Sequence, residues 1–174
     1  MRVVPYSNSL LGVPLFVALF CYFFASYYYG TAPGYLDHLE GALTLLSWDF
    51  INGQPLYTLP NSLNYSVNTY GPIHYLAQST MLILGEPTIA NSKLITLSAS
   101  SLAILLFGIH IWRRYGYFLM SIAIVLLAAI LLRQAPISFS VRPDTLILFI
   151  VTVALVVKDF DQAGRYGPVL FVAV

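Results

Sequence analysis

The chain has 174 residues, of which 59% are hydrophobic and 9% are charged, and its formal net charge is +1. A soluble globular domain carries about 25% charged residues, so this composition excludes an ordinary water-soluble fold. A net charge so close to zero gives no sign of a nucleic-acid partner. The single cysteine, Cys21, excludes an internal disulfide, and its place in an apolar run favours a small packed side chain. We therefore expect an integral membrane protein of the all-α class.

The first apolar run covers about residues 10–29, which is long enough to cross a hydrocarbon core about 30 Å thick. It is longer than the core of a signal peptide, so we expect a crossing that is retained. Arg2 precedes this run, whereas Asp37 and Glu40 follow it. Because positive residues favour the cytoplasmic flank, the N-terminus is predicted to be cytoplasmic and residues 30–90 to form an external loop.

This external loop is expected to contain two amphipathic helices that lie in the plane of the membrane interface. Large apolar residues recur at spacings of three and four between Leu39 and Phe50, which predicts one helix over about 36–51. Gly53 and Pro55 follow its last periodic residue and end it. The second helix is the run 73–84, which is shorter than the roughly 20 residues of a crossing and is more typical of an interfacial segment.

Further apolar runs predict a polytopic protein. They give crossings at about 92–112, 117–133 and 144–158, and the start of another at 168. The sequence ends inside this last run, so we expect the chain to be truncated.

Charge distribution supports an interfacial helix at 73–84. If this run does not cross, Arg113, Arg114 and Lys158 fall on the cytoplasmic side, as the positive-inside rule requires. The loop that contains Arg142 and Asp144 then lies outside, on the same side as the first external loop.

Asp37 is the main catalytic candidate, because it holds a carboxylate at the membrane surface where the first loop helix begins. A helix N-cap explains an aspartate at this place more simply. Glu40, three residues later, completes the pattern of a capping box. Both interpretations stay open.

Two histidines also lie in the first external loop. His38 and His74 could join Asp37 and Glu40 around a metal ion, but their spacing matches no metal motif. Contacts with water and lipid head groups are the simpler interpretation. Tyr70 could stack on a sugar face, as could other tyrosines of the loop.

The second external site is the sequence RPDT at 142–145. Asp144 and Pro143 suit the first turn of a helix. Arg142 could extend its guanidinium to water along the bilayer edge or bind the phosphate of an anionic lipid. Lys93 raises the same alternatives, with extension to water as the stronger one.

Four phrases occur in a definite order: YLDHLE at 35–40, NGQPLY at 52–57, YGPIHY at 70–75 and RPDTL at 142–146. Together they resemble the N-terminal part of the GT-C superfamily of membrane glycosyltransferases, of the type of the protein O-mannosyltransferases and aminoarabinose transferases (family 39). The last three are similar to that family's G-x-P-L-Y, Y-P-P-L-Y-Y and R-P-D-x-L phrases. The first departs from the family's Asp-Glu, since Asp37 is followed here by His38, with Glu40 two residues beyond.

The resemblance implies transfer of a sugar, with inversion, from a polyprenyl-phosphate donor to a glycan, lipid or protein acceptor. The expected place is the outer face of a bacterial plasma membrane. By position, Asp37 is implied as the base and Asp144 as a second acid, and the two would hold a divalent cation if one takes part. The residues expected to bind substrate are Arg142, Lys93, Glu40, His38, His74 and Tyr70.

The alternative is a non-enzymatic polytopic membrane protein, such as a transporter component or a lipid-binding scaffold. A transporter should carry polar residues near the bilayer midplane, around broken helices. The charges of this chain gather instead at the ends of its apolar runs, which favours a site at the membrane surface.

Overall fold

A computed structural model describes residues 7–32, 39–57 and 70–160 of the chain. This part contains helices joined by turns and no strand, which confirms the all-α prediction for it. The helices are α1 (Ser7–Thr31), α2 (Leu39–Ile51), α3 (Pro72–Leu84), α4 (Ile89–Arg133), α5 (Ala135–Ser138) and α6 (Asp144–Phe160).

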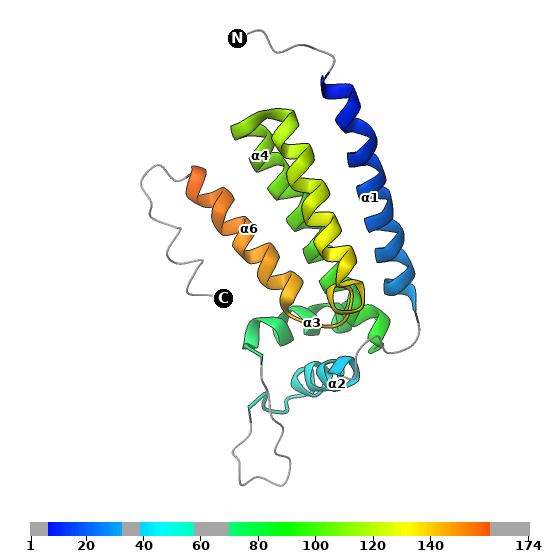
Figure 1. The fold of residues 1–174 in the computed structure, drawn as a ribbon. Coiled ribbons are helices and arrows are strands. Elements are labelled where there is room, and N and C mark those ends of the chain that lie inside the picture. Colours follow the sequence, from blue (N-terminus) through cyan, green and yellow to red (C-terminus); the bar gives the residue numbers. More distant parts are fainter. Residues whose placement is uncertain (1–6, 33–38, 58–69, 161–174) are drawn as a thin grey trace.

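Helix α4 is a hairpin of two helical arms that meet at Gly116. This glycine has φ 82° and ψ 177°, a backbone conformation that is essentially restricted to glycine. The arms are residues 89–115 and 117–133, and they cover the two ranges, 92–112 and 117–133, where the sequence predicts crossings. Figure 1 shows α1 and α6 packed alongside this hairpin to form a bundle.

Two helices are long and apolar enough to cross a membrane, Leu11–Thr31 within α1 and Ile89–Arg133. Only 17% and 22% of their most apolar stretches are buried, whereas the core helix of a soluble protein is mostly buried. On α1, Phe16, Phe20 and Phe24 form an exposed row with successive ring centroids 6.3 Å apart. An exposed apolar surface of this kind suits hydrocarbon rather than water.

The two short helices α2 and α3 lie crosswise at one end of the bundle (Figure 1). Each has 13 residues, so each is about 20 Å long and shorter than the hydrocarbon core. Helix α2 ends at Ile51, as predicted, and is followed by Gly53 at φ 85°. The same end of the bundle receives the end of α1 and the start of both α4 and α6.

Two apolar clusters hold the segment that precedes α6. Phe139 is fully buried, and its ring centroid lies 5.7 Å from that of Tyr22 and 5.8 Å from that of Tyr29. Val141 is also fully buried, in a second cluster with Leu43 of α2 and Tyr75 of α3. Residues 139–141 are therefore packed against α1 on one side and against the crosswise helices on the other. The short helix α5, which the sequence pattern does not predict, leads into this segment.

Candidate functional site

The crosswise helices and the bundle enclose a group of buried polar side chains, which we call the end cluster. Its members come from α2, α3, the first turns of α4 and the start of α6, and each is at most 7% exposed. They are Glu40, Thr44, Ser47, His74, Gln78, Ser79, Ser92, Lys93, Thr96 and Thr145. Polar groups are seldom buried in such numbers in an apolar chain, so the end cluster is the candidate functional site.

A buried ion pair joins α2 to α4 within the end cluster. Glu40, in the first turn of α2, places Oε2 3.7 Å from Nζ of Lys93, and both side chains are 0% exposed. Lys93 Nζ also donates to the carbonyl oxygen of Ala32, 3.3 Å away, at the end of α1. Glu40 Oε1 accepts a hydrogen bond of 3.1 Å from the backbone N–H of Val141. The pair therefore connects the end of α1, α2, α4 and the segment before α6.

These contacts change the interpretation of Lys93. The prediction that its side chain extends along the bilayer edge to water is wrong, because the side chain is fully buried against Glu40 and Ala32. An unpaired buried charge is costly, so each member of the pair compensates the other. The sequence predicts both as substrate-binding residues, which stays a prediction, and in this structure they contact each other and the backbone.

The interface between α2 and α3 depends on Ser47 and Gln78. Ser47 Oγ lies 2.7 Å from Gln78 Oε1 and 2.9 Å from the carbonyl oxygen of Leu43, but one hydroxyl proton can be donated to only one of them. Rotating the Gln78 amide by half a turn resolves this, because Nε2 then donates to Ser47 Oγ and Ser47 donates to Leu43. Ser79 Oγ donates to the carbonyl oxygen of Ser47 at 3.1 Å, which completes the contact between the helices.

His74 is a buried imidazole at the start of α3. It is 3% exposed, and neither ring nitrogen has a hydrogen-bond partner. Burial lowers the pKa of His74 from 6.5 to about 4, so the ring is neutral at pH 7. The ring of Tyr70 meets it edge-on with centroids 5.8 Å apart, and Tyr57 fixes this part of the chain by donating from its hydroxyl to the Tyr70 carbonyl at 2.9 Å.

The neighbouring Tyr75 is also affected by its surroundings. Burial first, and then the charges of Tyr57 and Tyr70, raise the pKa of Tyr75 to about 12. Tyr75 therefore stays neutral over the physiological range, as His74 does.

The end cluster has unused hydrogen-bonding capacity. The side-chain hydroxyls of Thr44, Ser92, Thr96 and Thr145 are buried and unpartnered, as are the nitrogens of His74. Buried polar groups in native proteins are nearly always paired with protein or water, so these groups call for a water or a polar ligand as a partner. Sequence reasoning missed the hydroxyl residues. Their signal was polar residues at helical spacing within the apolar runs, such as Ser92 and Thr96.

Arg142 and Asp144 lie beside the end cluster. Arg142 is half-buried, and its backbone N–H donates to the Ser140 carbonyl at 2.8 Å. Asp144 is exposed at the first residue of α6, where a carboxylate suits the helix dipole. Asp37 and His38 lie outside the described residues, so the meeting of Asp37 with Asp144 stays a prediction. Within residues 7–32, 39–57 and 70–160, no three His, Cys, Asp or Glu side chains form a group that could hold a metal ion.

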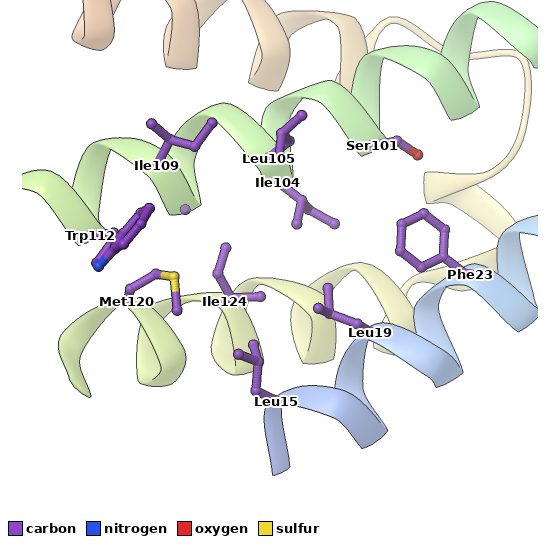
Figure 2. A pocket seen from close by; sticks show the side chains of 11 residues that line it. Leu15, Leu19, Phe23, Ser101, Ile104, Leu105, Ile109, Trp112, Met120 and Ile124 are labelled. Atoms are coloured by element: carbon purple, nitrogen blue, oxygen red, sulfur yellow. The ribbon is translucent and has the colours of Figure 1, made fainter. Parts of the chain in front are cut away.

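A separate cavity of about 270 Å³ lies between α1 and the two arms of α4. Figure 2 shows its lining, which includes Leu15 and Phe23 of α1, Trp112 of the first arm, and Met120 and Ile124 of the second. The lining is almost entirely apolar, and several of its residues lie close to the Gly116 turn, at the other end of the bundle from the end cluster. This cavity suits a hydrocarbon chain and offers nothing for acid–base chemistry.

No family model, curated protein or solved structure matches this chain.

Proposed function

We propose that this chain is part of a lipid-carrier-dependent glycosyltransferase, which transfers a sugar from a polyprenyl phosphate to an acceptor beside the end cluster. The hydrogen bond from Val141 N–H to Glu40 Oε1 carries this proposal. It joins the first loop helix, which follows Asp37, to the segment that leads into Arg142 and Asp144. Residues about 100 positions apart in sequence are thereby held at one end of the bundle, which is what the proposed reaction needs.

In the proposed arrangement in the membrane, the two ends of the bundle lie on opposite sides. Helices α2 and α3 are too short to cross, and they would lie in the plane of the outer interface. Arg113 and Arg114 lie beside the Gly116 turn, at the opposite end, and their charge supports a multi-pass protein whose N-terminus is cytoplasmic. The end cluster then faces the non-cytoplasmic side of the membrane, which we propose to be a bacterial plasma membrane.

The proposed reaction needs a base and a positively charged side chain. Asp37 takes the proton of the acceptor hydroxyl as it attacks the anomeric carbon, which inverts that centre. Arg142 stabilises the charge that develops on the leaving polyprenyl phosphate, because a guanidinium can bind two phosphate oxygens. Asp144 orients Arg142 or the acceptor, and with Asp37 it would hold a divalent cation if the reaction uses one.

The experiment is transfer of a labelled sugar from a polyprenyl-phosphate donor by the full-length protein in proteoliposomes. Asp37→Asn should lower the rate by a factor of about 100 or more, the usual contribution of a general base, without changing membrane insertion. Asp49→Asn removes a carboxylate from α2 itself and serves as the matched control. Wild-type transfer by Asp37→Asn would contradict the assignment.

The apolar cavity favours a second candidate function, that of a lipid-binding scaffold. A scaffold would retain the polyprenyl phosphate in a binding assay but would transfer no sugar. The same proteoliposomes therefore separate the two candidates by comparing bound donor with sugar transferred.

A further inference from the structure

We infer that Glu40 and Lys93 are positioning residues: their buried ion pair fixes the backbone at Val141 and thereby places Arg142 for its task. The inference rests on the proposed function, because Arg142 is the residue proposed to meet the donor phosphate. It assigns to the pair a role different from direct contact with substrate.

The geometry around Val141 supports this role. Its side chain is fully buried among Leu43 and Tyr75, and its N–H donates to Glu40 Oε1 at 3.1 Å. The next residue, Arg142, donates its own N–H to the Ser140 carbonyl at 2.8 Å. Both peptide groups that flank the Val141 α-carbon are thus held by hydrogen bonds, one of them to a charged acceptor, which is the stronger kind.

Lys93 holds the Glu40 carboxylate in place. The Lys93 ammonium lies 3.7 Å from Oε2 of Glu40, whereas the Val141 N–H donates to the other carboxylate oxygen, Oε1. The hydrogen bond from Lys93 to Ala32 at the end of α1 fixes the ammonium in turn. The chain of contacts therefore runs from α1 through Lys93 and Glu40 to the residue before Arg142.

Direct binding of substrate by the pair conflicts with its burial. Neither side chain is exposed, and a phosphate that captured Lys93 would leave the Glu40 carboxylate buried without its cation. A phosphate would instead meet Arg142, which is half-buried at the edge of the end cluster.

Four variants separate positioning from binding, and one of them is the single change Lys93→Met. Glu40→Leu removes the acceptor and the charge, whereas Glu40→Gln keeps an oxygen that can accept the Val141 N–H. The double variant Glu40→Leu/Lys93→Met replaces the buried pair by apolar side chains of similar size, a replacement that buried pairs often tolerate. Glu86→Gln, which removes an exposed carboxylate at the same end of the bundle, is the control.

The first measurement is amide hydrogen exchange of the full-length protein, followed at Val141 by fragmentation and mass spectrometry. Exchange should rise about tenfold or more in Glu40→Leu and in the double variant, because a hydrogen bond to a charged group is lost. It should rise by less in Glu40→Gln, which keeps a neutral acceptor but leaves Lys93 without its carboxylate, and it should stay at the wild-type rate in Glu86→Gln. Unchanged exchange in both leucine-containing variants would overturn the inference, and if neither folds, exchange in Glu40→Gln equal to that of the wild type would do so.

The second measurement is the kinetics of sugar transfer. Misplacement of Arg142 should raise the KM for the polyprenyl-phosphate donor about tenfold in Glu40→Leu and leave the KM for the acceptor unchanged. Lys93→Met should add little to Glu40→Leu in the double variant, because both act through the same contact. A rise in donor KM in Lys93→Met that Glu40→Leu does not share would show direct phosphate binding by Lys93 and overturn the inference.

The two measurements also keep the inference distinct from the proposed function. If wild-type protein transfers no sugar while Val141 exchange responds as expected, the glycosyltransferase proposal fails and the Glu40–Lys93 pair is shown to hold the segment before Arg142. If transfer occurs but Val141 exchange does not respond, the proposed function stands and the positioning role fails.

Discussion

Ser47 on α2 and Gln78 on α3 are joined by a side-chain contact of 2.7 Å, and both side chains are 0% exposed. The two residues are the main polar link between the crosswise helices. Because Gln78 is fully buried, its amide depends on this partner.

Ser47→Ala should therefore lower the free energy of unfolding by about 1–3 kcal/mol, the cost of leaving a buried amide without its partner. Thermal unfolding in detergent, followed by circular dichroism, measures the loss. Thr80→Ala is the control, since Thr80 is exposed and donates only to the Leu76 carbonyl of its own helix. Equal stability of the two variants would show that the Ser47–Gln78 contact contributes nothing.

His74 should make the stability of the fold depend on pH. Its pKa is about 4 in the folded chain and 6.5 in the unfolded one, so between these values the unfolded chain binds a proton that the folded chain does not. The contribution is fully present above pH 6.5 and falls as the pH is lowered, by at most about 3 kcal/mol at pH 4.

Unfolding measured at several pH values between 4 and 7 tests this dependence. His74→Gln should flatten the slope, because glutamine does not titrate. Tyr70→Phe keeps the ring beside His74 and should retain the slope. A slope in His74→Gln equal to that of the wild type would assign the pH dependence to other groups.

Gly116 should be required for the turn of the α4 hairpin. Alanine at φ 82° and ψ 177° is strained even though nothing lies within 4 Å of a Cβ at this position, so Gly116→Ala should cost about 1–3 kcal/mol. Gly12→Ala provides the comparison, because Gly12 lies inside α1 and a Cβ there meets only the Tyr117 hydroxyl at 3.9 Å. Helical alanine is favoured, so Gly12→Ala should stabilise by about 0.5–1 kcal/mol. Shifts of the same sign in both variants, measured by thermal unfolding in detergent, would contradict the backbone argument.

Much of the helical framework could be predicted from local features of the sequence. The length of its apolar run identifies α1, and apolar periodicity followed by Gly53 identifies α2 and its end at Ile51. The short run after Pro72 predicts a helix too short to cross, and α3 has that length. Each of these features is a property of neighbouring residues in the chain, so it can be predicted without the tertiary structure.

The candidate site was less accessible to sequence reasoning. Arg142 and Asp144 stand out because only 9% of the residues of this chain are charged, and both lie beside the end cluster. Lys93 stands out for the same reason, but its side chain turns inward to Glu40 and not outward to water. Whether a lysine side chain reaches water or a buried carboxylate depends on which helix packs against it. This packing could not be predicted from the sequence.

The sequence by itself determined that this is an apolar, all-helical chain with short amphipathic helices between long ones, because run length and periodicity are properties of neighbouring residues. Only the tertiary structure decided that the carboxylate in the first turn of α2, Glu40, meets Lys93 and the backbone of Val141. The physical reason is that apolar packing of Leu43, Tyr75 and Val141 brings three distant segments together, and the buried polar groups must then pair with whatever that packing places beside them.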